Sequence, residues 1–310
     1  MKYNQWSKEI NVYELSEGYS IHKAEWKEFS IHFATYEIFS INVWFRQSFD
    51  MYCSVLKDCD ICYWIKKDGH RMGGVLLEPN YMNCLFLEPP YNQYDEVLNE
   101  LRNILICWSD ESKKIIVGGV KPQEIKYYQR AGFRTGKARR CMIRPTEEFN
   151  INWSDEYQIV LPTVEREMEI VKLFNEAFQG GVGDDGNSTI DKQQESVKYY
   201  LNDNLQNNLV NKASTLIYYK KTNELVGACL ISIWEEWPNV YDIAVKPSFQ
   251  GNGLARNMIK KALTVLKEQH TVLRLFVTLG NDAEMSYHKL GFLAGVETTE
   301  MFLVEKESVC

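Results

Sequence analysis

Hydrophobic positions along the chain follow strand and helix periods, and the same order of elements occurs in both halves. Residues 62–77 and 216–231 each consist of two apolar runs around a short polar turn, which predicts a β-hairpin in each half. Residues 240–245 and 271–278 are rich in β-branched and apolar side chains and predict buried strands. Residues 254–269 have the spacing of an amphipathic helix. The pattern predicts a fold that mixes strands and helices.

A repeated motif indicates that one fold is used twice. Residues 287–292 read Tyr-His-Lys-Leu-Gly-Phe, and residues 128–133, located 159 positions earlier, read Tyr-Gln-Arg-Ala-Gly-Phe. A repeat at half the chain length is typical of tandem domains. The polar segment 145–150 follows a strand-like run. We therefore predict one domain over residues 1–148 and a second over residues 149–310.

The turn after the strand predicted at 240–245 has the features of an anion site. It consists of Gln250, Gly251, Asn252, Gly253, Leu254 and Ala255, and it opens the predicted helix. Uncovered N–H groups and the helix dipole together attract a phosphate or pyrophosphate, and a Cβ at the glycines would block its approach. A P-loop string is absent, and Arg256 stands where a dinucleotide fingerprint needs its third glycine.

The string Q-x-x-G-x-A on this turn, followed by Tyr287 four residues before Gly291, resembles the GNAT N-acetyltransferase superfamily. The resemblance covers residues 157–306. It implies an α+β protein of two tandem GNAT-like domains, each a mostly antiparallel twisted sheet flanked by helices. It also implies an enzyme that transfers an acetyl group from acetyl-coenzyme A directly to a primary amine, without a covalent intermediate.

The resemblance assigns roles to individual residues. The strand at 240–245 splays from its neighbour, and the backbone of Ile243, Ala244 and Val245 pairs with the pantetheine arm. The N–H of Val245 polarises the thioester carbonyl. The residues from Gln250 to Ala255, together with Arg256 and Asn281, lie on the coenzyme side. Tyr287 contacts the coenzyme and serves as the general acid that protonates the leaving thiolate.

The general base stays open among several groups. An amine with a pKa near ~10.4 must lose a proton before it attacks the thioester. Asp242 interrupts an apolar strand, where a carboxylate is costly unless it is paired or used. Glu235 and Glu236 lie between two tryptophans, whose rings attract cations. A chain of water molecules is a further route for the proton.

Acceptor selection is expected from the segment after the helix predicted at 162–178. Residues 179–188 contain four glycines and form a predicted loop, in which Asp184 and Asp185 could meet a cationic acceptor. A connector without a binding role is the alternative.

The first half lacks the phosphate turn. At an offset of 159 residues, positions 91–96 contain no glycine, and Tyr94 stands in place of Gly253. Asp95 and Glu96 would face the phosphates and repel them. We therefore expect residues 1–148 to be a degenerate copy that supports the structure or walls the acceptor pocket.

Charge and composition limit the classes of partner that the chain is expected to bind. Residues 1–150 carry 20 basic and 20 acidic side chains, so the net charge of −7 belongs to residues 151–310. This argues against nucleic acid and is compatible with a cationic small-molecule or peptide amine. The sequence has no apolar run of membrane-spanning length and no secretory segment. Eight scattered cysteines favour reduced thiols in a cytoplasmic protein.

The remaining expectations concern metals, the oligomeric state and activity. Cys59 and Cys62 form a lone C-x-x-C without a second pair or nearby histidines, so neither a zinc site nor a redox role is expected there. The histidines show no metal spacing, and no metal is expected. The oligomeric state stays open between monomer and homodimer. The alternative to an enzyme is a sensor or scaffold that binds acyl-coenzyme A but has lost catalysis. The sequence does not name the acceptor.

Overall fold

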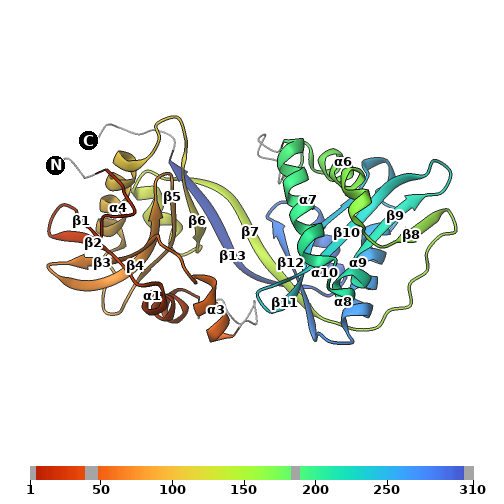
Figure 1. The fold of residues 1–310 in the computed structure, drawn as a ribbon, viewed down its shortest axis with the longest axis horizontal. Helices are drawn as coiled ribbons and strands as arrows, with labels where there is room; N and C mark the ends of the chain where they lie inside the picture. Colours follow the sequence, from red (N-terminus) through yellow and green to blue (C-terminus); the bar gives the residue numbers. More distant parts are fainter. Residues whose placement is uncertain (1–4, 39–47, 183–188, 304–310) are drawn as a thin grey trace. The chain divides into compact units, whose positions relative to one another are not determined.

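The computed structural model describes residues 5–38, 48–182 and 189–303, and the chain forms two compact units (Figure 1). Unit 1 comprises residues 1–139 and 296–310, and unit 2 comprises residues 140–295. This division differs from the predicted one at residues 148/149, because the chain passes between the units twice. The passages are β7 (Arg134–Pro145) and β13 (Leu293–Leu303).

Unit 1 is built on a sheet with the strand order β1-β2-β3-β4-β5-β6-β13. Its strands are antiparallel neighbours except for β5 and β6, which are parallel. The elements are β1 (Val12–Glu14), β2 (Tyr19–Lys23), α1 (Trp26–Phe33), η1 (Ala34–Ile38), α3 (Phe49–Val55), β3 (Cys62–Lys67), β4 (His70–Glu78), β5 (Tyr81–Leu87), α4 (Tyr94–Trp108), β6 (Ile115–Val120) and α5 (Ile125–Arg130).

Unit 2 has the strand order β7-β12-β11-β10-β9-β8, again with one parallel pair, β11 with β12, in an otherwise antiparallel run from β8 to β11. The elements are β8 (Tyr157–Val160), η2 (Val164–Arg166), α6 (Glu167–Phe178), α7 (Ile190–Asn204), α8 (Asn208–Ala213), β9 (Thr215–Tyr219), β10 (Glu224–Trp234), β11 (Trp237–Val245), η3 (Pro247–Phe249), α9 (Leu254–Leu266), β12 (Val272–Thr278) and α10 (Ala283–Lys289). The α+β fold and the predicted hairpins, strands and helix are confirmed.

Each half of the sequence ends in a strand that completes the sheet of the unit formed mainly by the other half. β13 follows α10 of unit 2 in the sequence, but it pairs with β6 of unit 1, with Thr299 opposite Val120 and Leu303 opposite Ile115. β7 follows α5 of unit 1, and its second half is the neighbour of β12 in unit 2. The two units therefore complete each other's sheets by an exchange of strands.

Helices cover both faces of the sheet in unit 2, and this explains the composition of its central strands. On β10, Val226, Cys229 and Ile231 pack with α8 and α9 in one core. Ala228 and Leu230 face the other core, with α6 and α7. A strand that is buried on both faces reads as a continuous apolar run instead of an alternating one.

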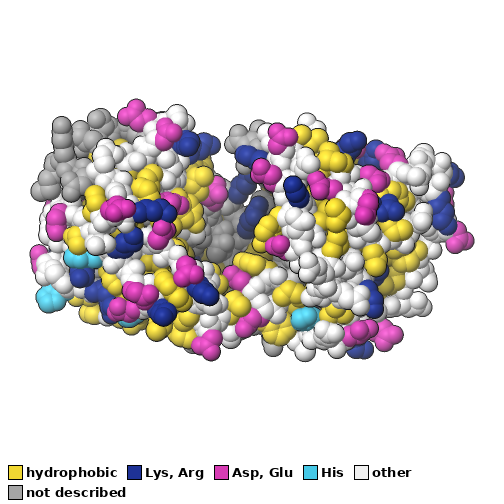
Figure 2. Space-filling model, viewed as in Figure 1, with side chains coloured by type: hydrophobic (Ala, Val, Ile, Leu, Met, Phe, Trp, Pro, Cys, Tyr) yellow, Lys and Arg dark blue, Asp and Glu magenta, His cyan; other side chains and the backbone are white. Residues whose placement is uncertain are grey.

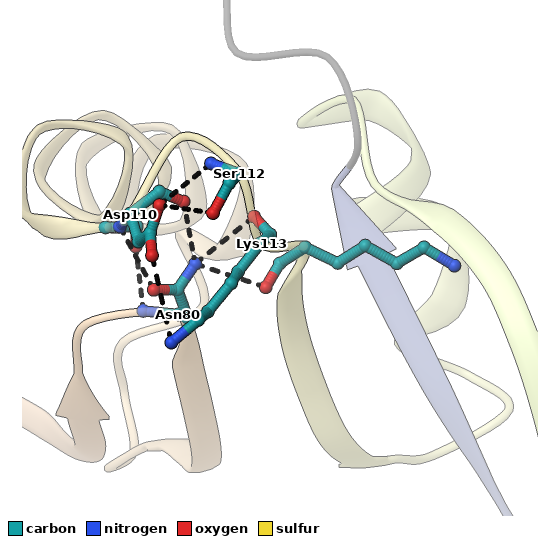
Figure 3. Close-up of polar contacts among 6 residues, drawn as sticks. Asn80, Asp110, Ser112 and Lys113 are labelled. Atoms are coloured by element: carbon teal, nitrogen blue, oxygen red, sulfur yellow. Dashed lines mark hydrogen bonds and ion pairs between the residues drawn. The ribbon is translucent and has the colours of Figure 1, made fainter. Parts of the chain in front are cut away.

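An asparagine joins the parallel strands of unit 1 at their first residues. Asn80, at the β4–β5 turn, donates from its side-chain amide to the carbonyl oxygens of Asp110, Lys113 and Lys114, at 3.2 to 3.3 Å. Its Oδ1 accepts from the N–H of Asp110. Figure 3 shows how the amide faces the loop that leads into β6. These bonds place β5 beside β6 where the pair begins.

The surface and the cysteines add two observations. On the face drawn in Figure 2, acidic and basic side chains are interspersed over both units. Within residues 5–38, 48–182 and 189–303, six cysteines are not disulfide-bonded. Cys107 is disulfide-bonded. The prediction of reduced thiols is therefore wrong for Cys107.

Candidate functional site

The turn between β11 and α9 has the backbone of an anion site. Gly251 and Gly253 have φ of +81° and +74°, and no other atom lies within 4 Å of the position that a Cβ would take at either residue. Gly253 is the N-cap of α9 in the left-handed conformation, and no side chain caps the first turn. The first N–H groups of a helix have no partner within the helix. Here they open onto the free space beside the two glycines.

The other residues of the turn support its shape. Gln250 donates from its side chain to the carbonyl of Val245, at 3.2 Å, and so holds the turn against the end of β11. Asn252 donates to the carbonyl of Phe249. Leu254 is buried in the core. Ala255 and Arg256 are exposed on the first turn of α9, and Arg256 forms no ion pair with any residue that the structure describes.

The strand before this turn separates from its parallel neighbour. The ladder between β11 and β12 has one pair among the described residues, Asn239 with Arg274. Beyond it, the backbone of β11 is bound on its β10 side, where Lys246 donates to Val226 at 2.8 Å. Because hydrogen-bonded pairs alternate along an antiparallel ladder, Ile243 and Val245 direct their N–H groups away from β10. The backbone of Ala244 points toward β10.

A β-bulge lies in the same strand. Leu230 faces Asp242 and Ile231 faces Val240, so Tyr241 is the additional residue. The Tyr241 hydroxyl lies 2.9 Å from the Ser196 hydroxyl on α7, and its ring packs with α7 and β10. Asp242 stands directly after the bulge and is half-buried. The bulge thus brings a carboxylate to the edge at which β11 has left β12.

Tyr287 lies across the sheet from the helices α6 and α7. It is half-buried on α10, and its ring packs on the core formed with α9 and contacts Phe292 edge-on. Burial raises the pKa of Tyr287 well above its ordinary value of 10, and the charges of Cys229 and Asp242 raise it further. The phenol is therefore protonated at neutral pH.

Glu235 and Glu236 lie elsewhere. They are the two central residues of the β10–β11 turn, with φ of +44° and +71°, between the paired Trp234 and Trp237. The buried Arg274 donates to the carbonyl oxygens of both tryptophans and fixes this turn. At about 3.3 Å per strand residue, the turn is roughly 15–20 Å from Asp242 along the strand. These glutamates therefore lie at the end of β11 opposite to the glycine turn.

The remaining predicted residues have simpler positions. Asn281 is exposed, and its Oδ1 accepts from the N–H of Ala283 at 2.9 Å, directly before α10, whose N-cap is Asp282. Asp184 and Asp185 lie outside the described residues.

A cation and a thiol beneath the site were not singled out from the sequence. The Lys261 ammonium donates to the carbonyls of Lys212 and Ser214, both at 2.7 Å, and to the Thr215 hydroxyl at 3.1 Å. Desolvation lowers the pKa of Lys261 to about 8. Burial raises the pKa of Cys229 to about 12, and Lys261 opposes this rise. The sequence signal that could have identified Lys261 is its position between the apolar residues of α9.

The corresponding turn of unit 1 has a different backbone. α4 begins at Tyr94 with Gln93 as its N-cap, at φ −79°. Counted from the helix starts, Gln93 corresponds to Gly253, one position from the predicted match with Tyr94. Asp95 and Glu96 occupy the first turn of α4 as expected. The Asp95 carboxylate accepts two hydrogen bonds from Arg130, and Glu96 accepts from Tyr19 and Lys67.

In the described part of the chain, no group of three or more His, Cys, Asp or Glu side chains is arranged to hold a metal ion. Among the same residues, no helix has the length and apolar character needed to span a membrane.

Comparison with known proteins relates part of unit 2 to a family and both units to a fold. Residues 169–292 match the model of the Acetyltransferase (GNAT) family. No curated protein sequence matches the chain. A GCN5-related N-acetyltransferase from Sphaerobacter thermophilus has a TM-score of 0.68 at 12% identity, over 93% of this chain and 96% of that one.

Two further solved structures have the same fold. A GNAT-family acetyltransferase from Colwellia psychrerythraea has a TM-score of 0.55 at 12% identity, over 91% of this chain and 98% of that one. A tandem GNAT protein from the clavulanic acid biosynthesis pathway has a TM-score of 0.52 at 10% identity, over 80% and 83%. Residues 169–292 of unit 2 thus match the GNAT family model, and the fold over both units is similar to that of solved GNAT structures, one of which is a tandem GNAT protein.

Proposed function

We propose that unit 2 is an N-acetyltransferase that passes an acetyl group from acetyl-coenzyme A to a primary amine. One observation carries this proposal: an uncapped helix with two left-handed glycines follows directly after a strand whose outer edge is open. The turn offers donors for a diphosphate, and the strand edge offers donors for an extended amide-containing arm. Their order along the chain matches the order of these groups in acetyl-coenzyme A.

The strand edge orients the thioester. The N–H groups of Ile243 and Val245 point to the open side of β11, so the pantetheine amides can pair with them as an added strand would. In this arrangement the N–H of Val245 polarises the thioester carbonyl and stabilises the oxyanion that forms on attack.

Two side chains manage the protons. Asp242 accepts the proton of the attacking ammonium, because its half-buried carboxylate stands at the bulge beside the open edge. Tyr287 donates a proton to the departing thiolate, because its raised pKa keeps the phenol protonated. The amine attacks the carbonyl carbon, the carbon–sulfur bond breaks, and the free thiol leaves with the proton of Tyr287. The acceptor is a small-molecule or peptide amine, and we propose a cytoplasmic location.

The coenzyme site is tested by calorimetry with acetyl-coenzyme A. A methyl group at Gly251 or Gly253 would occupy the space beside the turn, so Gly251→Ala and Gly253→Ala should each weaken binding by about tenfold or more. Gly69→Ala is the matched control, because Gly69 also has positive φ, +80°, and open space, but lies in the β3–β4 turn of unit 1. Equal affinities in all three variants would refute the site.

The reaction is tested by release of free thiol from acetyl-coenzyme A in the presence of a panel of polyamines, amino sugars, amino acids and peptides. We expect turnover with at least one amine class, and none with Gly253→Ala at subsaturating coenzyme. Tight coenzyme binding without turnover on any amine would contradict the enzyme and support a binding protein.

A further inference from the structure

Four cysteines of unit 1 gather in one core cluster. Cys53, Cys59, Cys62 and Cys84 pack with α1, α3 and the sheet face opposite α4, around Phe29. Cys59 and Cys62 form the C-x-x-C that lies between α3 and the first residue of β3. This part of unit 1 has no role in the proposed transfer reaction. It nevertheless concentrates half of the chain's eight cysteines in one place.

The two cysteines of the motif differ in exposure and lie against each other. Cys62 is fully buried, whereas Cys59 is partly exposed. The Cys62 Sγ lies 3.8 Å from the carbonyl oxygen of Cys59. A turn sets this geometry: Asp58 has φ +59°, and the N–H of Cys59 donates to Leu56 at 3.0 Å. Cys59 is thus partly exposed to solvent, and the buried Cys62 sulfur lies against the backbone carbonyl of Cys59.

Electrostatics distinguish the two thiols in the same way. A hydrogen bond from the Cys62 thiol lowers the pKa of Cys59 to about 6, although desolvation and the charges of Asp60 and Glu78 oppose this. The bond to Cys59 and burial raise the pKa of Cys62. The Lys8 ammonium lies 2.6 Å from Asp60 and offsets its charge. Reactive thiols have such partly exposed surroundings, and inert structural thiols do not.

We propose that Cys59 and Cys62 form a redox-active dithiol that exchanges with low-molecular-weight disulfides, with Cys59 as the attacking residue and Cys62 as the resolving one. The Cys59 thiolate attacks one sulfur of the disulfide, forms a mixed disulfide and releases the first thiolate. The Cys62 thiol then loses its proton to solvent and attacks Cys59, which releases the second thiolate. The dithiol loses two electrons, and the small disulfide gains them and takes up two protons.

The same residues argue against a metal site. No group of three or more metal-ligating side chains is arranged for an ion among the described residues, although Cys84 belongs to the same cluster. A cysteine pair in which one thiol is buried and the other can be attacked is the arrangement that thiol–disulfide exchange requires.

The first test measures alkylation of the intact protein at pH 6 with a limiting amount of iodoacetamide, followed by peptide mapping. A larger thiolate fraction, partly offset by lower nucleophilicity, predicts that Cys59 reacts about tenfold faster than Cys53. Cys53 is the matched internal control, because it is also partly exposed in this cluster but burial raises its pKa. Equal rates at Cys59 and Cys53 would overturn the assignment of Cys59.

The second test equilibrates the full chain in glutathione buffers of increasing oxidation. We expect a reversible Cys59–Cys62 disulfide in the wild type, a stable glutathione adduct on Cys59 in Cys62→Ser, and neither in Cys59→Ser. Cys53→Ser should behave as the wild type. Circular dichroism of each variant confirms that it is folded. Absence of both the disulfide and the adduct from folded protein at every glutathione ratio would overturn the proposal.

Discussion

The first turns of α4 and α9 occupy the same place in two copies of one fold, but they treat negative charge in opposite ways. α4 carries Asp95 and Glu96 in its first turn, so its own carboxylates complement the positive end of the helix. α9 carries no acid there, begins at a left-handed glycine and has no side-chain cap. Carboxylates in the first turn of a helix complement its positive end, so an external anion gains little there. Without such carboxylates, the N–H groups of the first turn can bind the anion of a ligand.

The two copies differ at two further matched positions. Three residues before the end of the central strand, unit 2 has Asp242 and unit 1 has Cys84. At the eighth residue of the following helix, unit 2 has Lys261 and unit 1 has the fully buried Leu101. Unit 2 thus keeps polar groups beneath its strand edge at positions where unit 1 has a thiol and an apolar side chain. The comparison teaches that the fold tolerates both choices, so function depends on these few positions.

The largest expected effect is at the strand position. Asp242→Asn should lower turnover by about 10² to 10⁴-fold, because it removes the proposed base, and should leave acetyl-coenzyme A affinity nearly unchanged. Steady-state kinetics and calorimetry measure the two quantities. Cys84→Ser, at the matched place of unit 1, should leave turnover unaffected. Undiminished turnover in Asp242→Asn would remove it as the base.

The next effect concerns Lys261 and pH. Its pKa falls from 10.5 to about 8 on folding, so the unfolded chain binds more protons between these values. The free energy of unfolding of the wild type should therefore rise by at most about 3 kcal/mol as the pH rises from 8 to 10.5. Below pH 8, the buried ammonium destabilises the protein to its full extent.

Lys261→Leu, which imitates unit 1, should lack this gain in urea unfolding at each pH. Lys267→Leu, at the exposed lysine that caps the end of α9, should follow the wild type. If the stability of Lys261→Leu and of the wild type depended on pH in the same way, the lowered pKa of Lys261 would be contradicted.

Tyr287 and Tyr128 test whether the repeated tyrosine has one role or two. Tyr287→Phe should lower turnover by about 10²-fold, near the lower limit for acid catalysis, since water can replace the donor. Because the pKa of Tyr287 is raised above 10, the wild type should show no alkaline loss of activity from this group below that pH. Tyr128→Phe should alter stability but not turnover. Equal turnover in both variants would show that Tyr287 is not the acid.

The smallest effect concerns the helix starts themselves. Asp95→Asn should slightly lower the melting temperature, because the first turn of α4 loses the carboxylate that accepts from Arg130. Arg256→Glu gives α9 the kind of acid that α4 already has. It should slightly raise the melting temperature and weaken acetyl-coenzyme A binding. Unaltered coenzyme affinity in Arg256→Glu would argue that the α9 terminus does not meet the diphosphate.

The sequence predicted the elements around the site well because their signals are local. Glycines 251 and 253, the apolar run before them and the spacing of α9 are all determined by neighbours within one or two turns of chain. The same holds for Asn281, whose bond to the N–H of Ala283 joins residues two positions apart.

Features that depend on distant contacts could not be predicted. Nothing in the pattern of β7 or β13 says which sheet receives them, because an amphipathic strand fits either edge. The sequence also does not reveal that Cys53 and Cys84 pack in the same core cluster as the C-x-x-C pair, because the folded chain brings these residues together.

The strand exchange bears on how the protein is made. During synthesis, residues 1–139 leave the ribosome well before residues 296–303, which supply the last strand beside β6. Until then, β6 is an open edge that could pair with another nascent chain. Separating the halves at residue 148 would make that exposure permanent in one product and would remove β7 from the other.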